Sequence, residues 1–332
     1  MTESRRHLIV THETWPIDGT FRISRGARTT ADVVVADLRE GDERGRGEAV
    51  PSPRFGETVS SVIAELGSVR REVEQGCNRA GLAELLPAGP ARAALDAALF
   101  DLESRQRRTP VWVLAGVPEP AAVVTAFTLS LAAPTEMAEA ARRNVSRPLL
   151  KLKVGGEADL ECVKAVRAAA PAARIIVDAN EAWTASQVST LPPMLAALGV
   201  ELIEQPLPAG RDHVLEQVPH PLPVCADESC RDRASVPALA GRYDMVNVKL
   251  DKAGGLTEAI EVVRAARAAG LGVMVGCMVS TSLAMAPALL LAGLADVVDL
   301  DGPLLLARDR DPGLRYEGSV VRPALPGLWG WP

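Results

Sequence analysis

Five charged residues follow one another along the sequence at a nearly constant interval. Lys153, Asp178, Glu204, Asp227 and Lys249 are separated by 25, 26, 23 and 22 residues. The three carboxylates each follow an apolar run that is typical of a strand buried on both faces. One strand and the helix after it occupy about this length in a (β/α) barrel. We therefore expect these five side chains at the carboxyl ends of successive barrel strands, where such barrels carry their active sites.

Three carboxylates from neighbouring strands would form an oxygen-rich site without histidine. Oxygen ligands of this kind suit Mg²⁺ better than Zn²⁺, and three protein ligands leave room for water and substrate oxygens. A cation there would bind a substrate carboxylate and stabilise the negative charge that forms when the neighbouring α-proton leaves. The sequence thus predicts a Mg²⁺ site at Asp178, Glu204 and Asp227. The alternative is that these are solvated charges at the ends of strands.

The two lysines flank the carboxylates, so they would face each other across the mouth of the barrel. A free lysine, with a pKa of about 10.4, is a poor base. Lys151 lies two residues before Lys153 and points the same way on a strand. Its charge and that of the metal would lower the pKa of the neighbouring lysine. One base on each face of a planar enediolate is what a racemase or epimerase requires, whereas the alternative for Lys153 and Lys249 is a pair of surface charges.

The hydrophobic pattern predicts the strands that carry these residues. From about Val117 onward, eight short apolar runs alternate with helices or loops, which predicts an α/β fold with a barrel of parallel strands. The runs are VVTAFTLSL, LLKLKV, RIIVDAN, VELIEQP, LPVCADES, YDMVNVKL, LGVMVGCM and ADVVDLD.

The N-terminal third has a different pattern. Strands are predicted at 7–13, 21–23 and 32–38, and a helix at 59–73 whose apolar residues recur at steps of 3 and 4. A second helix is predicted at 91–105, after Pro90. This pattern favours a separate α+β domain with a short antiparallel sheet.

The composition excludes several classes of protein. The chain has 332 residues, 48% of them hydrophobic, and a net charge of −6 without a long basic run, so we expect no nucleic-acid partner. The longest apolar stretch, 283–295, is shorter than the roughly 20 residues that span a bilayer, and the N-terminus lacks the apolar region of a signal peptide. We therefore expect a cytoplasmic protein without a membrane partner. Its five cysteines contain no CxxC pair, which favours reduced thiols.

The ordered set of motifs resembles the muconate-lactonizing subgroup of the enolase superfamily. The motifs are KLK at 151–153, VDAN at 177–180, IEQP at 203–206, ADES at 226–229 and NVK at 247–249. The resemblance implies a (β/α)7β TIM-like barrel at 117–306, an N-terminal α+β capping domain at 1–116, and a C-terminal segment at 307–332 that returns to the capping domain. It also implies Mg²⁺ on the three carboxylates and an acid–base pair formed by the two lysines.

The last strand distinguishes among members of this subgroup. Asp299 and Asp301 share one face of that strand, and two adjacent carboxylates attract a cation such as the free α-ammonium of a dipeptide. The pair resembles the signature of dipeptide epimerases, although it could also cap the strand before the Gly302–Pro303 turn. The same resemblance implies that Thr128, Lys151 and Cys277 contact the substrate. For Cys277, a buried packing role is the alternative.

The segment 21–28 (FRISRGAR) resembles the mobile loop of L-Ala-D/L-Glu epimerases. This resemblance implies that Arg28 binds the side-chain carboxylate of the substrate glutamate, for which the arginine fork is suited; the alternative is a solvated arginine. The segment 47–57 is similar to those enzymes, but not residue for residue.

The predicted protein is a Mg²⁺-dependent epimerase of small dipeptides. It would move a proton on and off the α-carbon of the second residue, and L-Ala-D/L-Glu is the expected substrate. Epimerases of hydrophobic or cationic dipeptides, N-acylamino acid racemases and cycloisomerases are the alternatives within the subgroup. A non-catalytic descendant of the fold is the alternative outside it. A homo-oligomer is possible.

Overall fold

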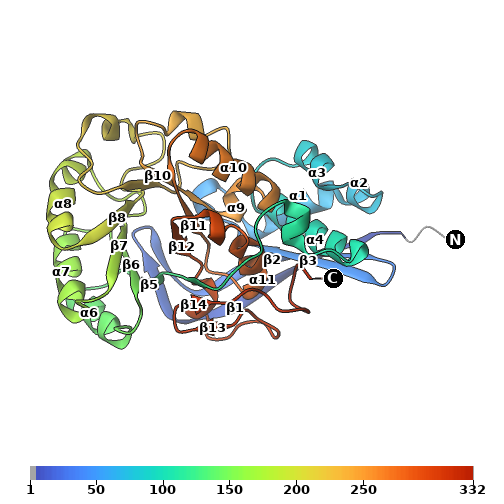
Figure 1. Ribbon diagram of the computed structural model, residues 1–332, viewed down its shortest axis with the longest axis horizontal. Coiled ribbons are helices and arrows are strands. Elements are labelled where there is room, and N and C mark those ends of the chain that lie inside the picture. Colours follow the sequence, from blue (N-terminus) through green and yellow to red (C-terminus); the bar gives the residue numbers. More distant parts are fainter. Residues whose placement is uncertain (1–4, 332) are drawn as a thin grey trace.

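The computed structural model describes residues 5–331 and has two packed parts (Figure 1). The first is an antiparallel sheet in the order β1-β2-β3, covered by helices. Its strands are β1 (His7–Ile23), β2 (Gly26–Glu40) and β3 (Glu43–Ala49). Its helices are α1 (Val59–Ser68), α2 (Arg70–Glu74), α3 (Arg79–Leu85), α4 (Pro90–Arg107) and α5 (Val111–Ala115), with a 3-10 turn at Pro53–Phe55.

The strands predicted at 7–13 and 21–23 are one long strand, β1. The pairing of β1 with β2 shifts register between Pro16 and Phe21 and then resumes to the tip of the hairpin. The polar and turn-forming residues between them (Asp18, Gly19) look like a loop in the sequence. Pairing with β2 on both sides of this stretch and a bridge between Ile17 and Leu306 keep it extended, and no local pattern reports these contacts.

The sheet and α4 approach each other closely because both use small residues. A Cβ added to Gly47 of β3 would lie 2.1 Å from the carbonyl oxygen of Ala94 in α4. A Cβ at Gly45 would lie 2.2 Å from the carbonyl oxygen of Ala98. Glycine on the strand and alanine on the helix therefore let the two backbones touch. This contact forms the centre of the N-terminal hydrophobic core.

The second part is a sheet of eight parallel strands in the order β12-β11-β10-β9-β8-β7-β6-β5. The two ends of this sheet also meet, because Ala126 N donates to the Val298 carbonyl at 2.9 Å and Leu300 N to Thr125 Oγ1 at 2.7 Å. The predicted barrel is thus confirmed. Its strands are β5 (Phe127–Leu129), β6 (Leu149–Lys153), β7 (Arg174–Asp178), β8 (Val200–Glu204), β9 (Val224–Ala226), β10 (Met245–Val248), β11 (Gly272–Gly276) and β12 (Val297–Asp299).

Helices surround the barrel strands, and their apolar faces form the larger core with the strands. They are α6 (Pro134–Arg143), α7 (Asp159–Ala169), α8 (Ala185–Ala197), α9 (Leu250–Ala253), α10 (Leu256–Ala268) and α11 (Ser282–Leu289). The connections on either side of β9 contain 3-10 turns, at His213–Gln217 and Val236–Ala238, instead of full helices. Two further 3-10 turns are at Ala292–Leu294 and Gly302–Leu305.

The C-terminal residues pack against both parts. A small antiparallel sheet joins β13 (Tyr316–Glu317), β14 (Val320–Val321) and β4 (Val123–Val124). Beyond it, the buried Trp329 donates from Nε1 to the Ala97 carbonyl at 3.0 Å, and Gly330 N donates to Asp101 Oδ1 at 2.8 Å. Both acceptors belong to α4, so the end of the chain is fixed to the N-terminal part.

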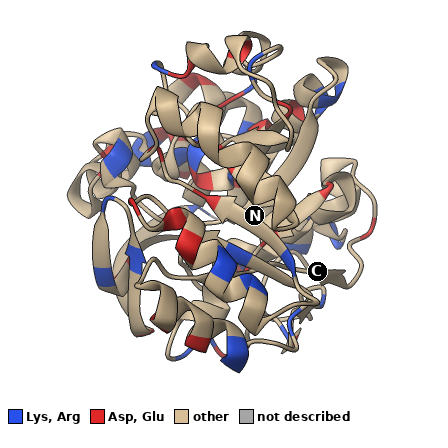
Figure 2. Cartoon of the chain, turned by 90° about the vertical axis from the view of Figure 1, so that its left-hand side faces the viewer, with Lys and Arg blue, Asp and Glu red and all other residues tan. Residues whose placement is uncertain are grey.

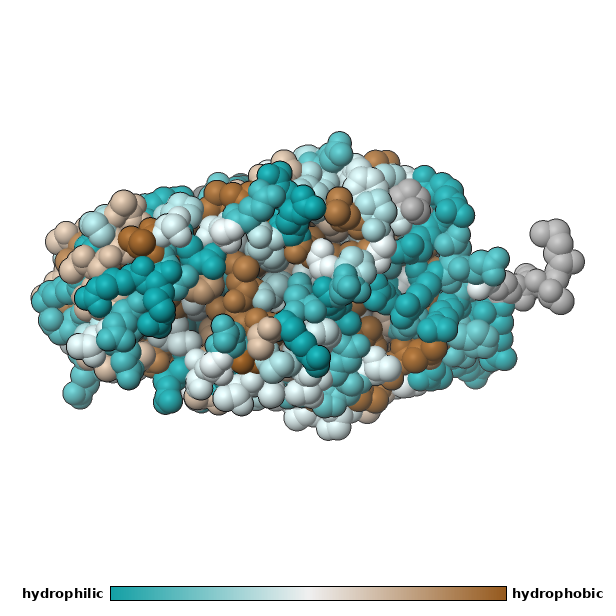
Figure 3. Space-filling model, turned by 90° about the horizontal axis from the view of Figure 1, so that it is seen from below, coloured by the Kyte–Doolittle hydropathy of each residue, from teal (hydrophilic) through white to brown (hydrophobic). Residues whose placement is uncertain are grey.

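The surface has no single dominant character in the views shown. Acidic and basic residues are interspersed over both parts (Figure 2), and hydrophobic residues form small groups among hydrophilic ones (Figure 3). Within residues 5–331, no helix combines the length and the hydropathy that a membrane span requires.

Candidate active site

A cavity of about 760 Å³, partly open to solvent, lies at the carboxyl ends of the barrel strands. The barrel contributes its floor, and the tip of the β1–β2 hairpin contributes part of its wall. Nine of the eleven residues predicted for the site line this cavity: Arg28, Thr128, Lys151, Lys153, Asp227, Lys249, Cys277, Asp299 and Asp301. The remaining two, Asp178 and Glu204, lie beneath it beside Asp227.

The three predicted metal ligands are brought together by the register of adjacent strands. Asp178 ends β7 and Glu204 ends β8, and these two residues are paired across the sheet. Asp227 directly follows β9. All three are buried, and one carboxylate oxygen of each lies within 4.8 Å of the others. An oxygen cluster of this size suits a hard divalent cation such as Mg²⁺.

The charges of this cluster are not balanced by hydrogen bonds alone. Burial, together with the carboxylates of Asp178 and Asp227, raises the pKa of Glu204 to about 7. Its Oε2 atom lies 2.7 Å from Lys151 Nζ. For Asp178, burial opposes ionisation, but Lys153 and Lys151 outweigh it and lower the pKa to about 2. Three crowded, buried carboxylates, one of them with a raised pKa, are what a bound cation would stabilise, so the residues fit the implied metal.

The two predicted bases lie on opposite sides of the carboxylates. Lys153 ends β6 and Lys249 follows β10, and β7, β8 and β9 lie between these strands. They are thus four steps apart in a barrel of eight. Lys153 Nζ lies 2.6 Å from Asp178 Oδ2, and Lys249 Nζ lies 2.7 Å from Asp227 Oδ2.

The environment of Lys249 depends on these carboxylates. Burial disfavours its charged form, but Asp227 and Glu204 outweigh burial and raise the Lys249 pKa above its usual range. Positive charge placed on those carboxylates would remove the cause of this increase. A deprotonated, basic Lys249 therefore requires the carboxylates to be neutralised by something other than lysine.

Lys151 connects the carboxylate cluster to the last strand. Its buried ammonium lies 2.7 Å from Glu204 Oε2, 3.2 Å from Asp178 Oδ2 and 2.7 Å from Asp299 Oδ2. Burial opposes this charge, but the carboxylates of Asp299, Glu204 and Asp178 raise the Lys151 pKa well above its usual value. Lys151 is therefore a fixed positive charge beside Lys153.

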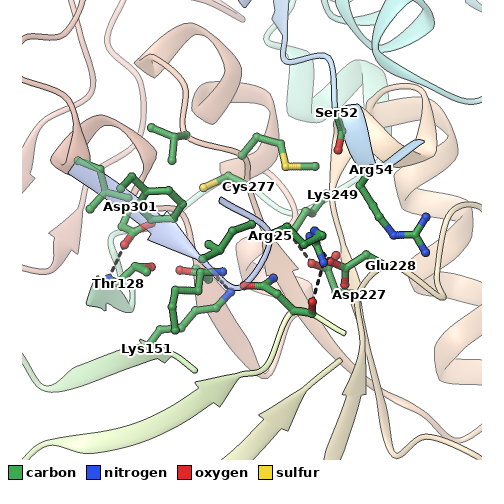
Figure 4. A pocket seen from close by; sticks show the side chains of 18 of the residues that line it. Arg25, Ser52, Arg54, Thr128, Lys151, Asp227, Glu228, Lys249, Cys277 and Asp301 are labelled. Carbon is green, nitrogen blue, oxygen red and sulfur yellow. Dashed lines mark hydrogen bonds and ion pairs between the residues drawn. The ribbon is translucent and has the colours of Figure 1, made fainter. Parts of the chain in front are cut away.

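Asp299 and Asp301 both line the cavity, and Asp301 lies on the side away from Asp227 (Figure 4). Asp301 Oδ2 accepts the backbone N–H of Thr128 at 2.6 Å, whereas Asp299 Oδ1 is buried and accepts no hydrogen bond within residues 5–331. Burial and the Asp299 carboxylate raise the Asp301 pKa to about 7. This pair can accept an additional cation. Cys277 lines the same side, and burial raises the pKa of its thiol well above the usual value, so it is a neutral wall residue.

Sequence reasoning missed Lys252, which lies three residues after Lys249 in α9. Its buried Nζ atom donates to Asp227 Oδ1 at 2.6 Å, to the Asn247 carbonyl at 2.9 Å and to the Asp227 carbonyl. These three bonds use all the donors of the ammonium, so Lys252 holds Asp227 in place. The one-turn spacing of the two lysines was the available signal.

Sequence reasoning also missed the role of Gln205, whose backbone has a positive φ of 34°. Its carboxamide oxygen accepts the N–H groups of Asp227 at 2.8 Å and Ser229 at 3.1 Å. It therefore fixes the backbone of the third carboxylate. No local pattern signals this, because the contact joins two different strand ends.

Two arginines of the β1–β2 hairpin line the cavity, and they differ in whether they form ion pairs. Arg28 is exposed, lines the cavity and forms no ion pair with any residue between 5 and 331. Arg25, at the tip, is paired with Glu181 and Glu228. The sequence suggested a role only for Arg28.

Two family descriptions match the chain and together cover most of it. "Mandelate racemase / muconate lactonizing enzyme, N-terminal domain" matches residues 5–116, and "Enolase C-terminal domain-like" matches residues 136–328.

Relatives with curated names share this length. The L-Ala-D/L-Glu epimerase of Escherichia coli (strain K12) is 46% identical over 313 residues, which is 94% of this chain and 98% of the relative. The N-acetyl-D-glutamate racemase of a Pseudoalteromonas species is 41% identical over 300 residues, 90% of this chain and 94% of the relative.

Solved structures are similar over the whole fold. An enolase family member from Agrobacterium tumefaciens superposes with a TM-score of 0.96 at 48% identity, covering 98% of this chain and all of that one. That structure is described as homologous to dipeptide epimerases, and it contains sodium and L-Ala-L-Glu with an ordered loop. A dipeptide epimerase from Enterococcus faecalis V583, in complex with Mg and L-Leu-L-Tyr, gives a TM-score of 0.90 at 27% identity over 98% of both chains.

Proposed function

Because the chain belongs to the mandelate racemase/muconate lactonizing enzyme family of the enolase superfamily, we propose that it is a Mg²⁺-dependent dipeptide epimerase. It inverts the α-carbon of the second residue of a dipeptide, and L-Ala-D/L-Glu is its preferred substrate. The proposal is supported by relatives and structural neighbours that are named for this activity.

Asp178, Glu204 and Asp227 would hold the Mg²⁺ ion. When bound, the ion would supply positive charge that offsets the negative charge developing on the substrate carboxylate as the α-proton leaves. Lys252 and Gln205 keep Asp227 in position for this role. With this site filled, the carboxylates would have a counter-charge other than lysine, so Lys153 and Lys249 would be able to act as bases.

Lys153 and Lys249 exchange the proton on opposite faces of the substrate. One Nζ atom removes the α-proton, and the other returns a proton to the opposite face, which inverts the configuration. Their positions on strands four steps apart support a substrate bound between them. Lys151 stays protonated and adds positive charge beside the forming enediolate.

The observation that carries the dipeptide assignment is the buried pair Asp299 and Asp301 in the cavity that also contains both lysines. Asp299 Oδ1 has no partner among the described residues, so it is available to a substrate ammonium. Lys151 occupies the other oxygen of the same carboxylate. The free amino group of a dipeptide is bound there, and Arg28 binds the side-chain carboxylate of a second-position glutamate.

Racemisation of an N-acylated glutamate is the second candidate, favoured by the similarity to N-acetyl-D-glutamate racemase. Such a substrate shares the glutamate carboxylates of L-Ala-L-Glu but lacks its ammonium. A neutral acyl group would leave Asp299 Oδ1 without a partner and Asp301 without a cation, which carries a free-energy cost. We therefore favour the dipeptide.

The test is exchange of the α-proton in D₂O, followed by ¹H NMR with purified protein and Mg²⁺. The substrates are L-Ala-L-Glu, L-Ala-L-Ala, L-Leu-L-Tyr and N-acetyl-L-glutamate. We expect deuterium at the glutamate α-carbon of L-Ala-L-Glu, with loss of exchange in the presence of a chelator. Exchange of N-acetylglutamate alone would reject the dipeptide assignment, and exchange of L-Leu-L-Tyr alone would reject the role of Arg28.

A further inference from the structure

Arg25, at the tip of the β1–β2 hairpin, forms the ion pairs that fasten this tip to the barrel (Figure 4). Arg25 Nη1 donates to the Asn180 carbonyl at 2.7 Å and to Glu181 Oε2 at 3.1 Å, and Nη2 donates to Glu228 Oε1 at 2.7 Å. The two carboxylate side chains are 7% and 5% exposed, and that of Arg25 is 34% exposed. The ion pairs are thus partly shielded from water, so they are stronger than those of a surface arginine.

The loops that Arg25 contacts are those that carry two of the predicted metal ligands. Asn180 and Glu181 follow Asp178, and the N–H of Asn180 donates to Asp178 Oδ1 at 2.9 Å. Glu228 directly follows Asp227. A single guanidinium from the capping part therefore joins the end of β7 to the end of β9.

The loop after β7 adopts a conformation that needs outside support. Asn180 and Glu181 have positive φ angles of 45° and 68°, which non-glycine residues adopt at a cost. The Asn180 carbonyl accepts from both Ser24 Oγ, at 3.2 Å, and Arg25. The docked hairpin tip thus supplies part of the hydrogen bonding that holds this loop, and Arg54, which follows β3, donates to the Glu181 carboxylate as well.

The hairpin tip also fits closely where it docks. A Cβ added to Gly155, in the loop after Lys153, would lie 2.7 Å from Cβ of Ser24. The tip therefore packs against the loop of the predicted base as well as the loops of the metal ligands.

We infer that Arg25 is a positioning residue: it locks the hairpin onto the β7 and β9 loops, and so orders Asp178 and Asp227 and sets Arg28 above the cavity. This inference rests on the proposed function for its kinetic readout. The guanidinium of Arg25 is committed to protein acceptors, whereas Arg28, three residues later, has no ion pair within the described chain. Arg25 acts through these loops, and Arg28 acts on the substrate.

This division predicts different kinetics for the two arginines. In Arg25→Gln, kcat/KM falls for L-Ala-L-Glu and for L-Ala-L-Ala by a similar factor, on the order of 10²-fold, because a displaced loop misplaces the reacting groups for every substrate. In Arg28→Gln, the loss is confined to L-Ala-L-Glu. A loss in Arg25→Gln confined to L-Ala-L-Glu would overturn the inference, because Arg25 would then be a substrate ligand.

Two readouts do not depend on turnover. Binding of Mn²⁺, followed by electron paramagnetic resonance, weakens by about 10- to 100-fold in Arg25→Gln, as expected when a group that orients metal ligands is lost, and is unchanged in Arg28→Gln. Amide hydrogen exchange of the segment 18–30 becomes faster in Arg25→Gln. Wild-type Mn²⁺ affinity and wild-type exchange in this variant would overturn the inference even if no dipeptide were turned over, so its failure is distinguishable from that of the proposed function.

A double-variant cycle distinguishes a direct link through the Arg25–Glu228 ion pair from a general loss of stability. Arg25→Gln and Glu228→Gln should each weaken Mn²⁺ binding, and the double variant should lose little more than either single variant. Additive losses would contradict a direct link. Arg25→Lys should recover part of the affinity, and Arg22→Gln, on the same hairpin but without an ion pair among the described residues, should match the wild type.

Discussion

Lys153 and Lys249 occupy equivalent places on opposite strands, yet each is paired with a different carboxylate. Under the proposed mechanism, each base would serve one face of the substrate and therefore one epimer. Neither lysine can replace the other, because three strands separate them. The stereochemical course should therefore be separable into two half-reactions by single substitutions.

We expect Lys153→Ala and Lys249→Ala each to lose epimerisation by at least on the order of 10²–10⁴-fold. One variant should keep α-deuterium exchange with L-Ala-L-Glu only, and the other with L-Ala-D-Glu only. ¹H NMR in D₂O measures both. Lys164→Ala, which removes an exposed lysine paired with Glu161, is the matched control. Retention of exchange with both epimers in either variant would contradict the two-base mechanism.

Substitution of Asp301 should lower kcat/KM only for substrates that carry an ammonium group. Asp301→Asn can still accept the Thr128 N–H but loses the charge that faces the dipeptide ammonium. We expect kcat/KM for L-Ala-L-Glu to fall by about 10- to 100-fold, since a hydrogen bond to a charged group contributes about 1.5–3 kcal/mol. Any activity on N-acetyl-L-glutamate should not fall. An equal loss on both substrates would remove the argument for ammonium recognition.

Between elements, the decisive contact is that of β3 with α4. Gly47→Ala should lower the free energy of unfolding by about 1–3 kcal/mol, because the new methyl group meets the Ala94 carbonyl and forces the strand away from the helix. Urea denaturation measures this loss. Gly67→Ala is the control: no atom lies within 4 Å of the added carbon, so this substitution within α1 should stabilise by about 0.5–1 kcal/mol. A neutral Gly47→Ala would mean that β3 and α4 can separate freely.

The residue next to Gly47 connects the N-terminal part to the barrel. Glu48, buried in β3, accepts from Thr281 N at 2.9 Å and from Arg310 Nη2 at 2.6 Å. Thr281 begins α11 of the barrel, and Arg310 belongs to the C-terminal residues. The strand that packs on α4 is therefore also the strand that holds the two parts together.

At the scale of the whole molecule, a buried acid joins the barrel to the capping part. Asp251 Oδ1, in α9, accepts the Val50 N–H at 2.7 Å. Burial, assisted by the carboxylates of Glu57 and Glu48, raises its pKa to about 7. Its unfolded pKa is about 3.9, so the folded protein prefers the protonated acid. The stabilisation is complete below about pH 4 and is lost as the pH rises through 7.

Asp251→Asn should therefore become more stable relative to the wild type between pH 5 and pH 8. The difference in the free energy of unfolding should grow by about 1.4 kcal/mol for each pH unit up to the folded-state pKa of about 7. Denaturant unfolding at both pH values measures the difference. Asp296→Asn is the control, because hydrogen bonds from Arg267 lower the Asp296 pKa, so its effect should be the same at both values. An equal effect of Asp251→Asn at pH 5 and pH 8 would contradict the assignment.

The sequence alone determined the barrel, the order of its strands and the set of charged residues at their carboxyl ends. These follow from local rules: apolar runs form buried strands, and the carboxyl ends of parallel strands meet on one face. Family motifs in the same order identified the dipeptide epimerases as relatives, which the comparisons confirm.

Only the tertiary structure decided which charges are partners. Lys151 joins Asp299 to Glu204, Lys252 holds Asp227, and Arg25 reaches residues more than 150 positions away. It also decided that β1 continues through a stretch that looks like a loop. Strand ends far apart in sequence become neighbours only when the barrel closes, and the hairpin finds its acceptors only when the capping part docks. Ion-pair choice depends on burial and distance, which no spacing along the chain specifies.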